Sequence, residues 1–165
     1  MKRLYSPWRS VYIKTFSEKG RKSCLFCRIK KEKKDRQNFV VWRGKHCYVV
    51  LNLFPYNSGH LMVVPYKHTK ELGELSNEES AEVFGVSSRC MKALNAISAP
   101  HGYNLGANLG RVAGAGIEQH LHFHIVPRWN GDTNFMPVLA DTKIISEELK
   151  GLWRKLKREM GRVDG

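Results

Sequence analysis

Three histidines alternate with apolar residues in one short segment, which reads His120-Leu121-His122-Phe123-His124. In an extended strand successive side chains point to opposite faces, so the three imidazoles share one face and the apolar side chains share the other. A single histidine in a strand is usually a structural residue, but three at a strict two-residue spacing are hard to obtain by chance. The segment therefore predicts a strand with one core face and one chemically active face.

The rest of the chain predicts an antiparallel sheet with helices packed against it. Short runs rich in β-branched and aromatic residues, separated by turn residues, are typical of strands. Five such runs occur, at residues 39–42, 46–54, 60–64, 103–109 and 119–126. Ser76 begins a segment with N-cap chemistry and early acidic residues, so a helix should run from there to about Ile97, before Pro100.

Residues 145–160 carry apolar side chains at three- and four-residue steps, with lysines and arginines between them. This spacing predicts an amphipathic, basic C-terminal helix that packs on the sheet and turns its cationic face to solvent. We therefore predict an α+β fold, in which an antiparallel β-sheet meander carries one helix between its strands and a second helix at the C-terminus.

A chain of 165 residues is long enough for one domain but too short for two ordinary ones. We predict a single domain over 1–165, divided into an N-terminal arm with a loop-rich cysteine knuckle (1–36), a catalytic core (37–138) and the basic helix (139–165). No segment approaches the roughly 20 apolar residues of a membrane span, and the first residues lack the apolar run of a signal peptide. We therefore expect a cytoplasmic protein that does not bind membranes.

Lysine and arginine outnumber aspartate and glutamate by 28 to 15, which gives a net charge of +13 and favours anionic ligands. Most of this excess lies in 19–36 and 150–162. Charge runs of this kind are more often solvated surface than binding sites, so nucleic acid is not an expected partner.

Imidazole is well suited to attack phosphorus near neutral pH, because its ordinary pKa of about 6.5 leaves one ring nitrogen unprotonated. Neighbouring imidazoles can orient the attacking ring and supply protons to phosphate oxygens or to the leaving group. The segment 104–116 reads NLGANLGRVAGAG, and its four glycines let backbone N–H groups approach an anion. The histidine face therefore favours a phosphate-containing substrate and a phosphoramidate intermediate.

The segment HLHFHIV resembles the hallmark of the histidine triad (HIT) superfamily, and the resemblance continues through 52–65, which read NLFPYNSGHLMVVP. The opening PWRSVYI, the knuckle CLFC and the later RWNGDTNFMPV resemble the branch of diadenosine tetraphosphate phosphorylases. One departure lies at Gly116, because many family members have Ser or Thr just before the apolar residue that leads into the triad. The sequence AGAGI at 113–117 itself resembles that of the phosphorylase branch.

The resemblance implies a role for each histidine of the triad region. It implies that His122 is the nucleophile, that His124 contacts the α-phosphate and the bridging oxygen, and that His60 supports the triad from a neighbouring strand. It implies that Asn52 bonds the ribose. The other implied phosphate-binding residues are Asn108, Gly114, Ala115 and Gly116.

Cys24 and Cys27 form a Cys-x-x-Cys pair, a spacing that lets one knuckle present both sulfurs to a metal. A redox pair is the alternative, although no thioredoxin-like βαβ pattern surrounds the two cysteines. Zinc needs four ligands, and the resemblance implies His68 and His120 as the other two. Such a zinc would be structural, with all four positions filled by protein. The isolated Cys47 and Cys90 are typical of small buried hydrophobes.

The expected activity is cleavage of diadenosine tetraphosphate, in which inorganic phosphate acts as co-substrate and the products are ADP and ATP. Three alternatives stay open. The first is a hydrolase, in which water is the acceptor and AMP is released. The second is an enzyme that removes adenylate from small amines or from DNA ends, as other members of the superfamily do. The DNA-processing members carry an additional zinc finger at their C-terminus, whereas no cysteine follows Cys90 here. The third alternative is a catalytically inactive nucleotide sensor. The resemblance also implies a homodimer or a larger homo-oligomer.

Overall fold

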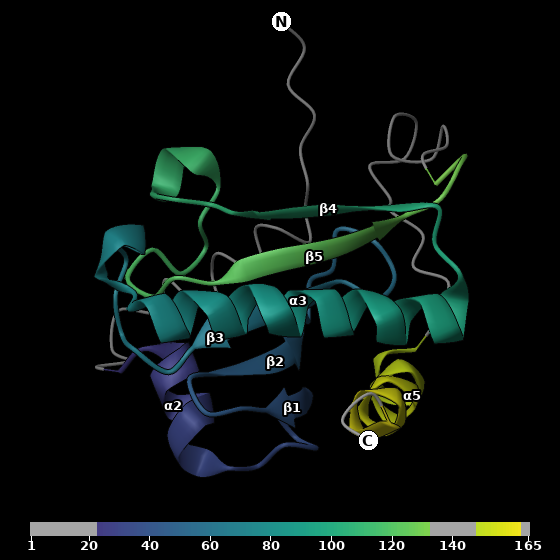
Figure 1. Cartoon of the computed structure of the whole chain (residues 1–165), viewed down its shortest axis with the longest axis horizontal. Helices are drawn as coiled ribbons and strands as arrows, with labels where there is room; N and C mark the ends of the chain where they lie inside the picture. Colours follow the sequence, from purple (N-terminus) through teal and green to yellow (C-terminus); the bar gives the residue numbers. More distant parts are fainter. Residues whose placement is uncertain (1–22, 133–147, 163–165) are drawn as a thin grey trace, which may run out of the picture.

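One five-stranded antiparallel sheet forms the centre of the protein, in the strand order β1-β2-β3-β5-β4 (Figure 1). The computed structural model describes residues 23–132 and 148–162 of the chain. The sheet, the helix between its strands and the C-terminal helix confirm the predicted α+β fold. Along the chain, the elements are α2 (Leu25–Glu32), β1 (Val40–Arg43), β2 (Cys47–Leu51), β3 (Leu61–Pro65), the 3-10 turn η1 (Leu72–Glu74), α3 (Asn77–Ser98), β4 (Gly102–Ala107), the 3-10 turn η2 (Arg111–Ala113), β5 (Phe123–Arg128) and α5 (Leu149–Arg162).

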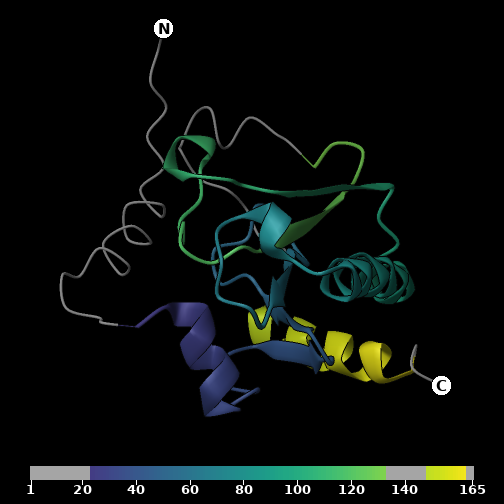
Figure 2. The ribbon, with the colours of Figure 1, turned by 60° about the vertical axis from the view of Figure 1, so that its left-hand side comes forward.

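Helices cover both faces of the sheet (Figure 2). On one face, α3 and α5 bury a large apolar cluster that includes Leu121, Phe123 and Ile125. On the other face, α2 packs through Phe26 and Ile29. Because side chains alternate along an extended chain, the three histidines share the face opposite this apolar cluster, as the sequence predicts, and that face is the one on which α2 packs.

The start of β5 differs from the prediction. The ladder begins at Phe123 and ends at Arg128. His120 and His122, which were expected within a strand over 119–126, therefore precede the observed strand. Pairing with β3 joins Leu61 to Ile125, Met62 to His124 and Val63 to Phe123, and it stops at this first residue of β5. The alternation of side chains nevertheless continues, since Leu121 is buried in the core.

The cysteine knuckle is helical, which corrects the loop-rich knuckle expected within the N-terminal arm (1–36). Cys24 is the N-cap residue of α2, and Cys27 lies in its first turn. The buried Phe26 and Ile29 are spaced three residues apart, which places them on one face of the helix. The many lysines and arginines around these two residues made the apolar spacing of the helix hard to recognise in the sequence. The opening PWRSVYI and most of RWNGDTNFMPV lie outside the described residues.

The helix α3 begins with a capping box, as its sequence predicts. The side chain of Ser76 accepts from the backbone N–H of Glu79, and the Glu79 carboxylate accepts from the backbone N–H of Ser76. The basic helix α5 buries Leu152, Leu156 and Met160 against the sheet and α3. Among the described helices, none combines the length and the apolar character needed to cross a membrane.

A tight turn between β2 and β3 places His60 next to the histidine strand. Gly59 has a φ of +81°, a conformation that side chains with a Cβ rarely adopt. A Cβ added there would also lie only 2.9 Å from a methyl carbon of Leu94. The backbone N–H of His60 donates to the carbonyl of Asn57, which closes the turn.

Candidate active site and metal centre

A chain of hydrogen bonds fixes where His60 and His124 carry their protons. The backbone N–H of Tyr56 donates to Nδ1 of His60 at 3.0 Å, so this nitrogen holds a lone pair. The proton of neutral His60 is therefore on Nε2, which donates to Nδ1 of His124 at 2.8 Å. His124 must then carry its own proton on Nε2.

The Nε2 atom of His124 is buried, and within the part of the chain that the structure describes it has no hydrogen-bond partner. Burial lowers the pKa of His124 to about 4, so the ring is neutral at pH 7 and has one N–H to donate. A buried donor without a partner costs stability, and a bound ligand oxygen would supply the missing acceptor.

The ring of His122 has the opposite arrangement. Its Nδ1 donates to the backbone carbonyl of His120 at 2.8 Å, which leaves the lone pair on Nε2. Burial lowers the pKa of His122, so this nitrogen stays unprotonated near neutral pH. The ring centroid of His122 is 4.9 Å from that of His124 and 5.0 Å from that of Phe26. The site thus places a fixed lone-pair nitrogen beside a fixed hydrogen-bond donor.

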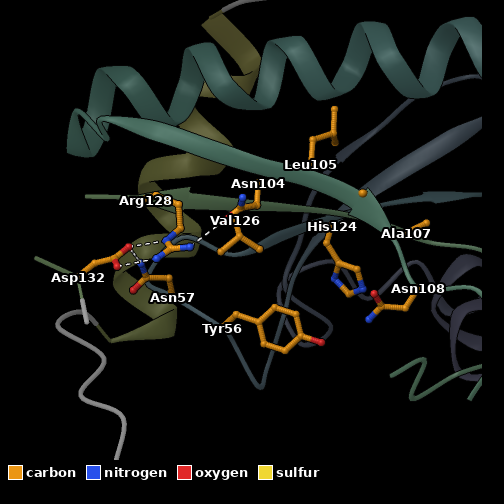
Figure 3. Close-up of a pocket in the computed structure, with 11 residues that line it drawn as sticks. Tyr56, Asn57, Asn104, Leu105, Ala107, Asn108, His124, Val126, Arg128 and Asp132 are labelled. Carbon is orange, nitrogen blue, oxygen red and sulfur yellow. Dashed lines mark hydrogen bonds and ion pairs between the residues drawn. The ribbon is translucent and has the colours of Figure 1, made fainter. Parts of the chain in front are cut away.

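A cavity of about 350 Å³ extends from His124 along β4 and β5 (Figure 3). His124 and Asn108 lie at one end of it, and Arg128 lies at the other. Tyr56 forms part of a wall between the two ends. The remaining lining residues are Asn57, Asn104, Leu105, Gly106, Ala107, Val126 and Asp132.

The far end of the cavity is held by a network around Arg128. Its Nε and Nη2 donate to the two carboxylate oxygens of Asp132 at 2.6 and 2.8 Å, and its Nη1 donates to Oδ1 of Asn104 at 2.9 Å. The amide of Asn57 donates to the same carboxylate at 2.8 Å. The Asp132 side chain is only 8% exposed, whereas that of Arg128 is 45% exposed. The guanidinium is therefore fixed in position while part of it faces the open side.

Among the residues implied to bind nucleotide, Asn52 lies next to the histidines. Its amide nitrogen is 3.3 Å from Nδ1 of His60, and its Oδ1 accepts from the backbone N–H of Phe54. Asn108 lies beside the ring of His124 (Figure 3). The structure therefore gathers both asparagines around the triad.

The glycine-rich loop is folded on itself. The backbone N–H groups of Ala113 and Ala115 donate to the carbonyl of Gly110, and that of Gly114 donates to the carbonyl of Arg111. Gly110 and Gly114 have φ values of +81° and +94°, which explains glycine at both positions. An anion that used the N–H groups of 114 or 115 would have to replace these internal bonds.

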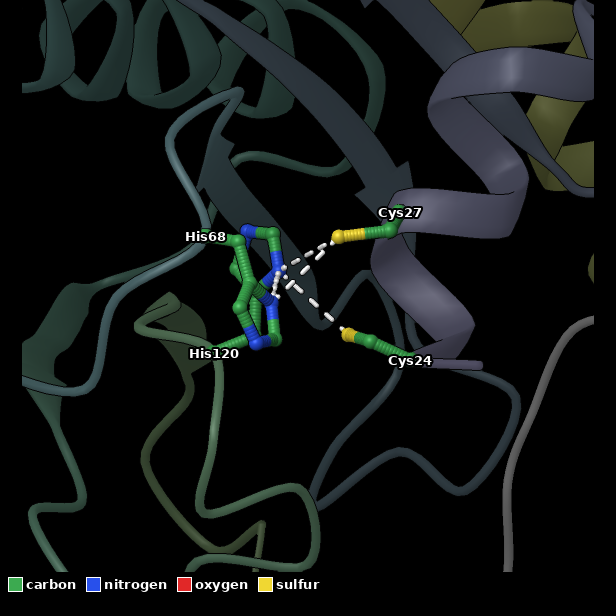
Figure 4. Close-up of side chains that lie close together, drawn as sticks. All are labelled: Cys24, Cys27, His68 and His120. Atoms are coloured by element: carbon green, nitrogen blue, oxygen red, sulfur yellow. Dashed lines mark hydrogen bonds between the residues drawn. The ribbon is translucent and has the colours of Figure 1, made fainter. Parts of the chain in front are cut away.

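Cys24, Cys27, His68 and His120 converge on one point, where the cysteines of α2 point toward the two imidazoles (Figure 4). The Nδ1 atom of His120 is 3.4 Å and 3.6 Å from the two sulfurs and 3.2 Å from Nδ1 of His68. The Cys27 sulfur is 3.3 Å from Nδ1 of His68. Ligand atoms placed tetrahedrally at 2.0–2.3 Å around zinc lie about 3.3–3.8 Å apart. Four of the six distances within the cluster therefore match a tetrahedral metal site, and all four ligand atoms lie within 4.8 Å of one another.

The imidazole of His120 is oriented for coordination. Its Nε2 donates to the carbonyl of Pro65 at 2.9 Å, which leaves the lone pair on Nδ1, the nitrogen that faces the cysteines. Burial lowers the pKa of His120 to about 4, which keeps the ring in the neutral form that a metal needs. The backbone N–H of Leu121 donates to the carbonyl of Thr69, which holds the segment of His68 against that of His120. The donor set and its geometry fit a metal ion.

Four residues that matter in this site are absent from the sequence-based prediction. Phe26 contacts the rings of both His120 and His122, and Tyr56 lies 4.7 Å from the His60 ring between centroids. Both aromatic residues lie in segments that carry the family resemblance, CLFC and NLFPYNSGHLMVVP, but no spacing or residue pattern there marks either of them as a site residue. Arg128 and Asp132 are four residues apart, a spacing that could have suggested an ion pair only if the local turn were known.

Known proteins resemble this chain in sequence and in fold. The family described as "HIT domain" matches residues 33–131. The AP-4-A phosphorylase of Mycobacterium tuberculosis is 46% identical over 128 residues, which cover 78% of this chain and 66% of that protein. An adenosine 5′-monophosphoramidase of Schizosaccharomyces pombe is 29% identical and is matched over 84% of this chain and 98% of its own length. Among solved structures, a Zn-bound histidine triad family protein from Mycobacterium smegmatis superposes with a TM-score of 0.69 at 25% identity, covering 86% of this chain and 96% of that one.

Proposed function

The chain belongs to the HIT domain family, and from this premise we propose that it is a nucleotidyl-transfer enzyme that cleaves diadenosine tetraphosphate at an α-phosphate. The observation that carries the proposal is the pair formed by the Nε2 lone pair of His122 and the unpartnered Nε2–H of His124. The substrate class is supported by the name of the M. tuberculosis relative, of which this chain covers 66%. Related dinucleoside polyphosphates contain the same α-phosphate linkage.

In the first step, the Nε2 lone pair of His122 attacks the α-phosphorus and forms a P–N bond. The bond from phosphorus to the bridging oxygen breaks, and its electron pair leaves with the polyphosphate, which departs as ATP. His124 donates its Nε2–H to this oxygen as negative charge develops. The imidazolium formed at His122 keeps its Nδ1–H, which the carbonyl of His120 accepts and stabilises.

In the second step, an oxygen of inorganic phosphate attacks the α-phosphorus from the side that ATP has left. The P–N bond breaks, its electrons return to Nε2 of His122, and ADP is released. Water in place of phosphate would give AMP and one proton. We propose phosphorolysis, because the sequence similarity to the named phosphorylase spans 78% of this chain.

The other nucleotide contacts that we propose follow from where the polar side chains lie. Asn52, whose amide nitrogen is 3.3 Å from Nδ1 of His60, would bond the ribose of the adenosine bound to His122, the role that the family resemblance implies. Asn108, beside His124, would contact phosphate oxygens, and the loop of Gly114, Ala115 and Gly116 would close over them after exchanging its internal bonds.

We propose zinc as the metal of the four-residue cluster, held by Cys24, Cys27, His68 and His120. Two sulfurs and two imidazole nitrogens in a tetrahedral array are a preferred ligand set for zinc. When bound, zinc would tie α2 to the segment before β5 and would take no part in phosphoryl chemistry. The positions of Phe26 and His122 depend on this connection, because Phe26 packs on the ring of His122.

Product analysis with and without phosphate tests the proposed reaction. We expect the purified protein to convert diadenosine tetraphosphate to ADP and ATP in equal amounts when inorganic phosphate is present. Without phosphate, turnover should fall sharply, because no acceptor completes the second step. Nucleotides are separated by ion-exchange chromatography. Release of AMP at a rate that does not depend on phosphate would identify a hydrolase and contradict phosphorolysis.

We also propose that two copies of the chain pair through the edge of the sheet at β4. This strand is one of the two edge strands of the sheet, and Leu105 on it is exposed, as are Leu109 and Val112 just after it. An open edge with apolar side chains is a ready site for association. Light scattering should give twice the mass of the chain, and Leu105→Lys should shift the equilibrium toward the monomer. A monomeric wild-type protein at micromolar concentration would contradict this.

A further inference from the structure

We propose that the cavity beside His124 binds the nucleoside of the leaving group, which is the half of the dinucleotide that does not become attached to His122. This inference rests on the proposed function and deepens it, because it assigns a separate subsite to the second nucleoside. The cavity volume of about 350 Å³ lies within the range of small-molecule sites. All the residues that line the cavity are within the described part of the chain.

The cavity lies on the side from which the leaving group departs. In an in-line displacement, the leaving oxygen is opposite the attacking nitrogen, and His124 is the group that meets this oxygen in the proposed reaction. From His124 the cavity follows the same face of the sheet, because Gly106 pairs with His124 and Asn104 pairs with Val126. Arg128 lies four residue steps along β5 from His124, a span of about 13 Å. A polyphosphate arm that starts at His124 therefore leads its nucleoside toward Arg128.

The walls of the cavity suit a nucleoside better than a phosphate chain. Tyr56 and Val126 offer apolar surface on which a base can pack, and Gly106 adds no side chain. The charge of Arg128 is balanced by the bidentate Asp132, so the far end has little net attraction for a further anion. Of the five N–H donors of the guanidinium, three are used by Asp132 and Asn104. The remaining donors and the exposed guanidinium plane can meet the edge or the face of a base.

The network around Arg128 also prepares the site before a ligand arrives. Asp132 holds the guanidinium through two hydrogen bonds, and Asn57 and the backbone N–H of Trp129 hold Asp132 in turn. A side chain that is already fixed loses little conformational freedom on binding. Arg128 would therefore act as a specificity residue for the second nucleoside and would not contact the scissile phosphate.

Gly106 provides the means to block the cavity without touching the triad. A Cβ built on it has no heavy atom within 4 Å, and Gly106 is not among the glycines with positive φ. A valine is therefore compatible with the strand, and its side chain would occupy the space that the ligand needs. Gly102 is a matched control on the same strand and the same face, with equally open space but no position in the cavity wall.

The test measures binding in a His122→Ala background, which prevents turnover. Calorimetry compares diadenosine tetraphosphate with AMP, which fills only the subsite next to His122. We expect the parent to bind the dinucleotide about tenfold or more tightly than AMP. Gly106→Val should remove this advantage and leave the affinity for AMP within about threefold. Arg128→Gln should act in the same direction, and Gly102→Val should change neither affinity.

Two outcomes would overturn the inference. If Gly106→Val weakened the affinity for AMP and for the dinucleotide equally, the cavity would not be a separate subsite. If Gly106→Val and Arg128→Gln both left the affinity for the dinucleotide unchanged, no nucleoside would occupy the cavity. A parent protein that binds neither ligand would instead defeat the proposed function itself. Light scattering on each variant checks that the assembly state is the same.

Discussion

Replacing His122 with alanine is expected to lower kcat for diadenosine tetraphosphate by about 10⁴-fold or more, because the reaction loses its nucleophile. The Nε2 atom of His122 is the lone-pair nitrogen that the structure orients beside the donor N–H of His124. Direct attack by phosphate or water on the α-phosphorus is the only remaining route, and the site is not arranged for it. Binding should persist, since Asn52, His124 and the cavity remain.

The measurement combines initial rates in the presence of phosphate with the affinity of the same variant for the dinucleotide. A matched control is His46→Ala, because His46 lies outside the triad, immediately before β2, and its backbone N–H, which the substitution keeps, donates to the carboxylate of Glu82. This control should retain most of the wild-type rate. If His122→Ala kept a tenth or more of the wild-type kcat, the nucleophile would have to be assigned elsewhere.

The same variant separates an enzyme from a nucleotide sensor. A sensor would use the triad only to hold the ligand, so the variant would keep its function as long as it kept its affinity. Trapping the intermediate gives an independent measurement: rapid acid-free quenching of wild-type protein with labelled substrate should leave adenylate on the chain. The variant should carry none. Wild-type protein that turns over substrate but never becomes labelled would favour direct transfer.

The sequence predicted the faces of the sheet well, because burial imposes an alternation that can be seen in HLHFHIV without any structure. Leu121, Phe123 and Ile125 lie in the core and the three histidines lie on the other face. The capping box at Ser76 was equally visible, since it depends on residues three apart in the chain. Local chemistry of this kind needs no knowledge of the fold.

The parts that could not be predicted depend on contacts between distant segments. The donor role of His124 follows only from its bond to His60, 64 residues away, and from the backbone of Tyr56. The lone-pair side of His120 is set by the carbonyl of Pro65. Main-chain partners such as these have no signature in the sequence. The helix α2 was missed because its two buried residues stand among cations.

The Cys/His cluster and His122 are physically connected. His120 supplies Nδ1 to the cluster, while its carbonyl accepts the Nδ1–H of His122. Phe26 forms a second connection, since it lies one residue before Cys27 and packs on the rings of both histidines. A metal held by α2 and His120 would therefore fix the orientation of His122 without contacting substrate. Loss of the metal should lower both stability and kcat.

Zinc is expected to raise the thermal stability of the protein strongly. A ligand that binds only the folded state at about 1,000 times its Kd contributes about 4 kcal/mol. For a chain of this size, 1 kcal/mol shifts Tm by about 2–4 °C. We therefore expect a strong chelator to lower Tm by about 8–16 °C, and added zinc to restore it. Calorimetric scans of the wild-type protein before and after chelation provide the measurement.

Cys27→Ser should abolish this response, because it removes one of the four ligands and leaves a weaker donor in its place. Metal analysis of the wild-type protein should give one zinc per chain, and the variant should give much less. Cys90→Ala is the control. Cys90 is a buried residue of α3 that belongs to the apolar core and is not one of the four proposed metal ligands. That variant should start from a lower Tm, since a core contact is lost, yet retain its zinc and its response to chelation. A wild-type protein with substoichiometric zinc and a Tm unaffected by chelation would contradict a structural zinc. In that case only Phe26 and the carbonyl of His120 would orient the ring of His122.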